Sequence, residues 1–339
     1  MAYRAISAAV LAVLLASPLA AQPAGDFYVD KQITLIVGAD VGGGYDAQGR
    51  LMARFLGQFI PGHPAIVVQN MPAGGSLAAA NHLYNIAARD GTVIGLMQRN
   101  VLTAKWTSPS VVKFEIDKFN WIGSLASETG VLAAWHDAPV TKAGDLLTHE
   151  LIVGGTIGTD TEISGRLLNA LAGTRLKIVS GYKGNADVLL AMERGEVQGI
   201  ADESWSNLKT TKPDYLRNHL VTLLLQNALK KSPELPDVPL ALDFARSDED
   251  RKVMELYFGQ KVVARPVMAP PGIPADRLSV LRQAFMAMAE DAAFRDAAIK
   301  AKLELNPSSN EAVDRFVTLL ATTPPAIAQR FSDVTAARN

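Results

Sequence analysis

The sequence predicts an α/β protein with two lobes, each built on an open sheet. Its 339 residues are too many for one ordinary core and too few for a repeat array. Short apolar segments rich in β-branched residues alternate with segments of helical periodicity, which is typical of a largely parallel sheet flanked by helices. This alternation occurs near the start of the chain and again after residue 150, so we expect two such units.

The first unit begins with residues 33–37, an apolar run that stops at Gly38 as a buried parallel strand would. A turn with three glycines follows, and apolar residues then recur at helical spacing up to Pro61 and Gly62. The unit then repeats its strand, glycine-bearing loop and helix. The predicted strands are 33–37, 65–69 and 92–97, and the predicted helices are 47–59 and 77–88.

The second unit has the same order of elements. Its predicted strands are 151–153, 177–179 and 197–200, and its predicted helices are 163–171 and 187–194. Three further helices are predicted at 275–290, 292–302 and 309–320. We expect these C-terminal helices to pack back on the first lobe.

The first 21 residues have the layout of a secretory signal peptide. Arg4 precedes a short apolar run, and small residues lead to Ala20 and Ala21. A retained membrane anchor would need a run of roughly 20 apolar residues. We therefore expect cleavage after Ala21 and a soluble mature protein in the periplasm.

Composition and motifs argue against several other classes of protein. A formal net charge of −1 does not provide the excess of positive charge that is typical of nucleic-acid-binding proteins. The chain has no cysteine, which excludes disulfides and cysteine-ligated metal, and its 5 histidines lack the spacing of metal ligands. It contains no Walker loop, no Gly-x-Ser-x-Gly and no His-Glu-x-x-His. We predict no cofactor, no metal and no enzymatic activity.

The glycine-rich turn after the first strand is the first candidate site. Successive glycines allow positive φ, which turns several N–H groups toward one point, and the following helix N-terminus adds partial positive charge. Together these features can hold an anion, although small residues in a tight turn can also serve packing alone. For Asp46 we favour a capping role, because a bare carboxylate would repel an anionic ligand. The candidate residues are Val41, Gly42, Gly43, Gly44, Tyr45 and Asp46.

The loop after the second strand has the same chemistry in the same position. Ligands of open α/β sheets lie beyond the carboxyl ends of the strands, so the two loops should converge on one crevice. Its candidate residues are Met71, Ala73, Gly74, Gly75 and Ser76.

The second lobe offers hydroxyl and backbone donors before its first helix. The candidates are Thr156, Gly158, Thr159, Asp160 and Thr161, with N-capping of that helix as the equal alternative. Tyr182 and Ser204 also follow predicted strands and are further candidates for the cleft.

Taken together, these stretches resemble the substrate-binding receptors of tripartite tricarboxylate transporters, also called the Bug family. The motifs occur in the same order as in the family and cover nearly all of the chain after the predicted signal peptide. The whole set in this order is far more specific than any single motif. It rests on ITLIVGADVGGGYD (33–46), VVQNMPAGGS (67–76), DGTVIGL (90–96), GYKGNADVLLAMERGEVQG (181–199), KSPELPDVP (231–239) and MAPPGIP (268–274).

The resemblance implies a two-lobed periplasmic-binding-protein fold of the Venus-flytrap, type II, kind. Lobe 1 would comprise 22–126 and 227–339 and lobe 2 would comprise 127–226, with hinge crossings near 126–131 and 223–227. The ligand would be a small organic carboxylate, either a di- or tricarboxylate or an aromatic acid. Backbone groups and waters of loops 41–46 and 71–76 would hold one carboxyl group, and loop 156–161 would select the rest.

The partners implied by the resemblance are the membrane permease subunits of a tripartite transporter, and we expect the receptor to be a monomer. The chain departs from the family in the first loop, where the family usually has a proline, as in Pro-Phe-x-Pro-Gly-Gly. Residues 38–43 read GADVGG here, which lacks the proline and adds an acid at Asp40. Two alternatives stay open. One is a periplasmic sensor that signals to a histidine kinase. The other is a secreted hydrolase or isomerase with Asp46, Asp160 or Glu203 as its base.

Overall fold

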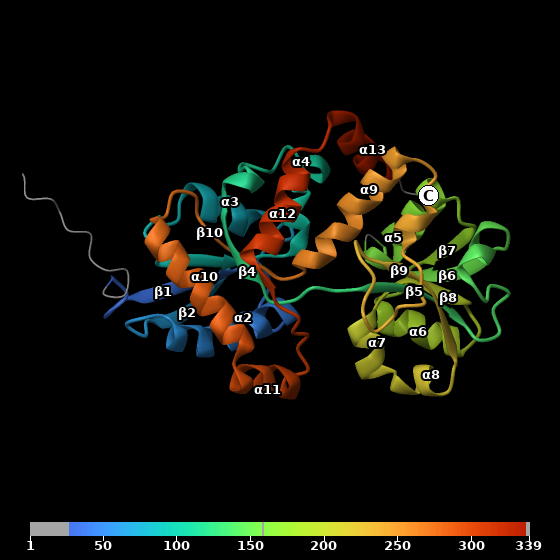
Figure 1. The fold of residues 1–339 in the computed structure, drawn as a ribbon, viewed down its shortest axis with the longest axis horizontal. Helices are drawn as coiled ribbons and strands as arrows, with labels where there is room; N and C mark the ends of the chain where they lie inside the picture. Colours follow the sequence, from blue (N-terminus) through green and yellow to red (C-terminus); the bar gives the residue numbers. More distant parts are fainter. Residues whose placement is uncertain (1–26, 158, 337–339) are drawn as a thin grey trace, which may run out of the picture.

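The computed structural model describes residues 27–157 and 159–336, which form two α/β lobes side by side (Figure 1). The predicted signal peptide and Gly158 lie outside the described residues. Each lobe has one mixed sheet, which confirms the predicted fold class. No helix within the described ranges is long and apolar enough to span a bilayer.

The sheet of lobe 1 combines early and late parts of the chain. Its strands, in spatial order, are β11 (Ser308–Ser309), β4 (Asn120–Ser124), β10 (Pro266–Ala269), β3 (Val93–Leu96), β1 (Gln32–Val37) and β2 (Ala65–Asn70). The strand β1 pairs in parallel with β2 and β3, as predicted, whereas β10 is antiparallel to both β3 and β4. The carboxyl ends of β1, β2 and β3 therefore lie at one edge of this sheet.

Helices from both ends of the described chain cover the sheet of lobe 1. They are α2 (Gly44–Leu56), α3 (Leu77–Asn85), α10 (Ala275–Glu290), α11 (Ala292–Lys300) and α12 (Asn310–Ala321). The helices α10 and α12 contact β4, and α11 contacts α2, so the expected packing of the C-terminal helices on the first lobe is confirmed. Short helices occupy the connections: η1 (Gly57–Phe59), η2 (Arg99–Leu102), α4 (Ala104–Thr107) and η3 (Ile116–Lys118).

The sheet of lobe 2 has the spatial order β7 (Leu176–Ser180), β6 (Leu151–Gly155), β8 (Gly199–Ser204), β5 (Gly130–Trp135) and β9 (Val221–Asn227). Its helices are α5 (Asp160–Ala172), α6 (Asn185–Glu193), α7 (Trp205–Thr211) and α8 (Pro213–Arg217), with η4 (Ala143–Leu147) before β6. The helix α5 begins at Asp160, three residues before its predicted start, which makes Asp160 part of its first turn.

The chain passes between the lobes in two stretches. It leaves the first sheet at Ser124 and enters the second at Gly130, close to the predicted crossing. The return starts after β9 and reaches the first sheet only at Pro266, through η5 (Ala241–Phe244), α9 (Asp248–Gly259) and η6 (Gln260–Val263). Because α9 contacts α5 of lobe 2 as well as α12 and the last helix, α13 (Pro325–Ala336), the lobe boundary at residue 227 stays a prediction.

The last helix, α13 (Pro325–Ala336), joins the two lobes at the top of the view in Figure 1. It contacts α4 of lobe 1 as well as α5 and α9. Its Phe331 ring lies 5.5 Å from the ring of Trp106 in α4, and Arg166 of α5 donates a 3.1 Å hydrogen bond to the carbonyl of Thr335. One apolar core cluster accordingly runs from lobe 1 through α9 and α13 into lobe 2.

Candidate ligand-binding site between the lobes

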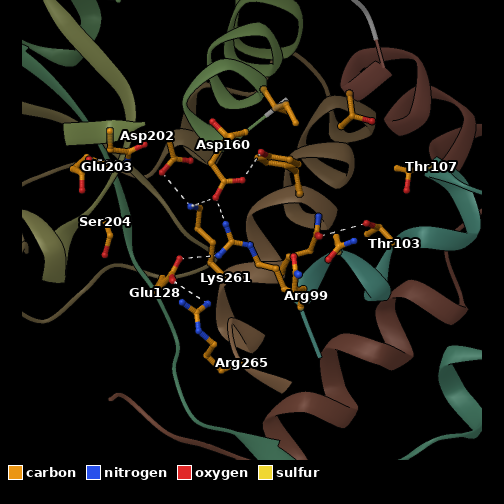
Figure 2. Close-up of a pocket in the computed structure, with 18 of the residues that line it drawn as sticks. Arg99, Thr103, Thr107, Glu128, Asp160, Asp202, Glu203, Ser204, Lys261 and Arg265 are labelled. Atoms are coloured by element: carbon orange, nitrogen blue, oxygen red, sulfur yellow. Dashed lines mark hydrogen bonds and ion pairs between the residues drawn. The ribbon is translucent and has the colours of Figure 1, made fainter. Parts of the chain in front are cut away.

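A cavity of about 740 Å³ lies between the lobes and is lined by residues of both lobes and of both connections (Figure 2). Pockets that bind small ligands commonly have volumes of roughly 300–1,000 Å³. The charged residues of the lining are Arg99, Glu128, Asp160, Asp202, Glu203, Lys261 and Arg265. Polar donors such as Asn100, Thr103 and Asn207 complete much of the rest.

An ion pair crosses this cavity from one lobe to the other. Arg99 stands at the start of η2, directly after β3 of lobe 1, and its guanidinium pairs with Asp160 at the first position of α5 in lobe 2. Asp160 also accepts a 2.8 Å hydrogen bond from the hydroxyl of Tyr257. Burial opposes the charge of Asp160, but Lys261 and Arg99 hold its pKa below the usual range.

Lys261 lies in the returning connection and is 4% exposed. Its ammonium lies 3.1 Å from a carboxylate oxygen of Asp202 and 3.4 Å from one of Asp160. Burial opposes the charge of Lys261, but these two carboxylates raise its pKa above that of an ordinary lysine. Asp202 accepts a further 2.5 Å hydrogen bond from Ser164, and its burial raises its own pKa. The ammonium is therefore held charged between two acids.

Glu128, in the first connection, links two arginines. It lies 2.9 Å from Arg99 and 3.9 Å from Arg265. Arg265 also donates a 2.7 Å hydrogen bond to Gln48, and its guanidinium stacks 4.2 Å from the ring centre of Tyr45. These contacts hold Arg265 against lobe 1, so its position depends on the start of α2.

Two glutamates that belong to different lobes have raised pKa values. Glu203, at the end of β8, accepts 2.7 Å hydrogen bonds from the amides of Asn185 and Asn207, and its burial raises its pKa. Glu304, in the segment before β11, has its pKa raised to about 7 by burial and by Glu128, while a hydrogen bond with Ser206 of lobe 2 opposes the rise. Glu304 therefore lies close to the second lobe although it belongs to the first.

The first glycine loop is organised around Asp46, which is 3% exposed. Its carboxylate accepts hydrogen bonds from the N–H of Gly42 at 2.8 Å, from Arg50 at 2.9 Å and from the amide of Asn70 at 2.9 Å. The bond from Arg50, with those from Gly42 and Asn70, lowers the pKa of Asp46 to about 2. Asp46 thus holds the loop in shape, in agreement with the capping role that we favoured.

The second glycine loop is tied to the first by a buried hydroxyl. Ser76 donates a 2.6 Å hydrogen bond to the carbonyl of Gly38 and accepts one of 2.9 Å from the N–H of Gln98. Positive φ values at Gly74 (58°), Gly75 (60°) and Ser76 (74°) produce the turn. The two loops are neighbours, as predicted. The hydrogen bonds of the Asp46 and Ser76 side chains are made to other groups of lobe 1.

In the loop before α5, the threonine hydroxyls largely bind within the loop. The hydroxyl of Thr161 accepts a 2.9 Å hydrogen bond from the N–H of Thr156, and that of Thr159 donates one of 2.9 Å to the carbonyl of Thr156. Thr159 precedes α5 without a side-chain capping bond. The buried hydroxyl of Thr156 has no hydrogen-bond partner among the described residues.

Four of the predicted site residues line the cavity, namely Tyr45, Thr159, Asp160 and Ser204. Gly158 lies outside the described residues. The remaining described candidates, Val41 to Gly44, Asp46, Met71, Ala73 to Ser76, Thr156, Thr161 and Tyr182, do not line the cavity in this arrangement of the lobes. Their role toward a ligand stays a prediction.

Sequence reasoning missed the cations of the cavity. Arg99 follows β3, so extending the strand-end rule to the third strand would have found it. Lys261 and Arg265 lie in a connection with no motif, and no local signal marks them. They reach the cavity only because the chain returns there between α9 and β10.

The three carboxylates considered as catalytic bases are all engaged by other groups. Asp46 is held by Arg50, Asp160 by Arg99 and Lys261, and Glu203 by two asparagine amides. A base with a strongly lowered pKa is a poor proton acceptor near neutral pH, which weakens the case for Asp46 and Asp160. Among the described residues, no group of three or more acids and histidines is placed to hold a metal ion.

Two α/β lobes with a polar cavity between them are the architecture of the two-lobed, type II fold of periplasmic binding proteins. The chain belongs to the tripartite tricarboxylate transporter receptor family. The family model, described as "Tripartite tricarboxylate transporter family receptor", matches residues 51–330. Membership of a receptor family confirms the expectation that the chain is a binding protein and not an enzyme.

Relatives of known sequence support this assignment. A UPF0065 protein of Agrobacterium vitis is 26% identical over 268 residues, which cover 76% of this chain and 74% of the relative. A UPF0065 protein of Cupriavidus necator is 25% identical over 244 residues, which cover 70% of this chain and 71% of the relative.

Solved structures share the fold. A TctC solute-binding protein from Polaromonas without ligand has a TM-score of 0.69 at 17% identity, covering 91% of this chain and 98% of its own. An R. palustris protein with adipate has a TM-score of 0.57 at 19% identity, covering 91% and 98%. MatC from Rhodopseudomonas palustris with bound malate has a TM-score of 0.54 at 20% identity, covering 90% and 99%.

Proposed function

We propose that this chain captures a small carboxylate between its lobes and delivers it to the membrane subunits of a tripartite tricarboxylate-type transporter. The observation that carries the proposal is the cavity of about 740 Å³ that contains Arg99, Lys261 and Arg265. Arginine recognises carboxylates well because its planar donors match the two oxygens. The adipate and malate bound to structures of the same fold support this chemistry.

The capture step in this proposal is a closure of the lobes about the two connections. Closure brings loops 41–46 and 71–76 toward the ligand from lobe 1 and loop 156–161 from lobe 2. Water leaves the cleft, and the electrostatic interactions with the carboxylate become stronger in the lower dielectric. The buried hydroxyl of Thr156 is a donor that a ligand can engage in this state.

The location in this proposal is the periplasm, reached through a signal peptide that is cut after Ala21. Its charged start, short apolar run and small-residue exit support export. Mass spectrometry of the protein purified from the periplasm tests the cleavage site, since a mature chain that begins elsewhere than Gln22 contradicts it.

A thermal-shift screen of organic acids, amino acids and amides tests the capture of a ligand. A ligand at 100 times its Kd should stabilise the protein by about 2.7 kcal/mol, which corresponds to a few degrees in Tm for a protein of this size. Arg265→Met should greatly reduce the shift, whereas Arg54→Met, on the exposed face of α2, should retain it. If no compound in the panel raises the Tm of the wild-type protein, the capture proposal fails.

Delivery is tested separately in cells. Deletion of this chain should abolish uptake of the radiolabelled ligand identified in the screen, and expression of the wild-type chain should restore it. Unchanged uptake in the deletion strain, combined with firm binding in vitro, would contradict delivery while leaving capture intact.

A further inference from the structure

The last helix, α13, links the lobes in addition to the two connections (Figure 1). It follows α12, which packs on β4 and η3 of lobe 1. The link between the two helices is the short segment 322–324, and Pro324 and Pro325 restrict the backbone there. The start of α13 is therefore tied closely to lobe 1.

The middle of α13 is also bound to lobe 1, at α4. The ring of Phe331 lies 5.5 Å from the ring of Trp106, and the hydroxyl of Ser332 donates a 3.2 Å hydrogen bond to the carbonyl of Trp106. Phe331 is only 1% exposed. Movement of α13 away from lobe 1 would expose this aromatic ring to water, which is unfavourable.

The same turn of α13 reaches the segment that returns the chain to lobe 1. Arg330 forms an ion pair with Asp250 of α9, and its Nε donates a 3.1 Å hydrogen bond to that carboxylate. The ring of Phe331 lies 6.5 Å from the ring of Tyr257, whose hydroxyl donates a 2.8 Å hydrogen bond to Asp160 of lobe 2. The helix is thus packed against a residue that binds the ion pair between the lobes.

The end of α13 is bound to lobe 2 by a buried arginine. Arg166 of α5 has a side chain that is 10% exposed, and its guanidinium donates a 3.1 Å hydrogen bond to the carbonyl of Thr335. It also contacts Glu162 at 3.3 Å. A cation is favourable at the C-terminus of a helix, where the last carbonyls carry partial negative charge. A buried guanidinium in turn needs partners, so Arg166 and the end of α13 stabilise each other.

The helix α13 is also part of the wall of the cavity. Phe331 and Thr335 line it, together with Thr107 of lobe 1 and Ile163 of lobe 2. A change in the width of the cleft must therefore either carry α13 along with one lobe or break its contacts with the other. Because a short covalent link ties α13 to lobe 1, the contact with lobe 2 is the one that can break.

We propose that α13 is a strap between the lobes, which fixes the angle between them through the contact of Thr335 with Arg166. Two covalent connections alone would leave the lobes free to rotate about a hinge. A third, non-covalent contact opposes that rotation, and the rotation becomes free when the contact breaks. The strap acts on the lobes themselves, whatever ligand the cleft holds.

A distance measurement between two spin labels by double electron–electron resonance tests the strap. The chain has no cysteine, so Asp296→Cys in α11 and Asn218→Cys directly after α8 introduce one labelling site into each lobe, both at exposed positions. The helices α11 and α8 lie at the bottom of Figure 1, away from α13 at the top. In the full chain without ligand, we expect one narrow distribution of distances. Removal of residues 325–339 should broaden it by at least about twofold, because more lobe angles become accessible.

A single substitution breaks the contact with lobe 2 and leaves the helix in place. Arg166→Met, in the same labelled chain, should also broaden the distribution. Arg175→Met is the matched control and should keep the wild-type width, because Arg175 donates its 3.3 Å hydrogen bond to the carbonyl of Thr148 within lobe 2. Circular dichroism establishes that each variant is folded.

The width of the distribution separates a strap from a helix that only adds stability. A wild-type width in Arg166→Met, or in the shortened chain, would overturn the strap even if the Tm falls. Equal broadening in Arg166→Met and Arg175→Met would also overturn it. Where the shortened chain does not fold, the comparison of these two substitutions decides alone.

Discussion

Arg99 of lobe 1 and Asp160 of lobe 2 form an ion pair across the cavity, so the two lobes are joined by charge as well as by the covalent chain (Figure 2). Asp160 is also held by Lys261 and Tyr257, which come from the segment that returns the chain to lobe 1. The relative placement of the lobes is therefore coupled to the ionisation of this cluster.

Replacement of the arginine in this pair should destabilise the protein. Arg99→Met leaves Asp160 and Glu128 with one cation fewer, and we expect the free energy of unfolding to fall by about 1–3 kcal/mol. Arg217→Met is the matched control, because Arg217 and its partner Asp214 are 71% and 67% exposed and such a pair contributes roughly 0–1 kcal/mol. Urea denaturation measures both values. Equal losses in the two variants would contradict a structural role for the interlobe pair.

Asp46 should stabilise the protein above pH 4 and cease to do so in acid. Its pKa in the folded state is lowered from 3.8 to about 2, so the ionised form is favoured by folding. The resulting stability is present above pH 3.8 and disappears as the pH falls toward 2. Asp46→Asn should accordingly be less stable than wild type at pH 6, with a difference that shrinks between pH 4 and 2 when followed by thermal denaturation. Asp40→Asn removes the same charge from an exposed position of the same loop and should lower the stability at pH 6 by less than Asp46→Asn.

The close contact between the two glycine loops predicts opposite results for two glycine substitutions. A Cβ at Gly38 would lie 2.3 Å from the hydroxyl oxygen of Ser76, which is itself fully buried. Gly38→Ala should therefore lower the free energy of unfolding by about 1–3 kcal/mol. A Cβ at Gly44 would meet nothing within 4 Å, so Gly44→Ala, at the first position of α2, should be neutral or up to about 1 kcal/mol stabilising. Chemical denaturation of both variants measures these changes. A Gly38→Ala variant as stable as the wild type would contradict the close contact between Gly38 and Ser76.

Glu304 should make stability fall as the pH rises through the neutral range. Burial and Glu128 raise its pKa from 4.5 to about 7, so the folded state holds a proton that the unfolded state releases. The stabilisation from this proton is complete below pH 4.5 and is lost as the pH approaches and passes 7. Glu304→Gln keeps the neutral form at every pH, so the stability difference between wild type and variant should change over this window. A constant difference from pH 4.5 to 8 would contradict the raised pKa.

The strands that sequence periodicity predicted are those with a strong local signal. Residues 33–37 and 65–69 became β1 and β2 because apolar, β-branched runs suit a strand that is covered by helices. The strands β4, β5 and β10 were not predicted. Their sequences NWIGS, GVLAAW and PVMA contain glycine, alanine or proline, and they are held by antiparallel pairing with distant segments, which leaves no local period.

The site shows the same division. Capping by Asp46 was predictable, because its partner Gly42 lies four residues away and a helix start favours a carboxylate there. The cation set of Arg99, Lys261 and Arg265 was not, because these residues come from separate connections and no motif links them.

The sequence by itself determined the two α/β units, the glycine loops at the ends of the first two strands, and the resemblance that family membership later confirmed. These features depend on local periodicity, backbone freedom and short-range order in the chain. Only the tertiary structure decided which charges share the cavity and how they are neutralised. The reason is physical: ion pairs such as Arg99 with Asp160 depend on how the lobes are placed, and that placement is set by the packing of α9 and α13 across both lobes.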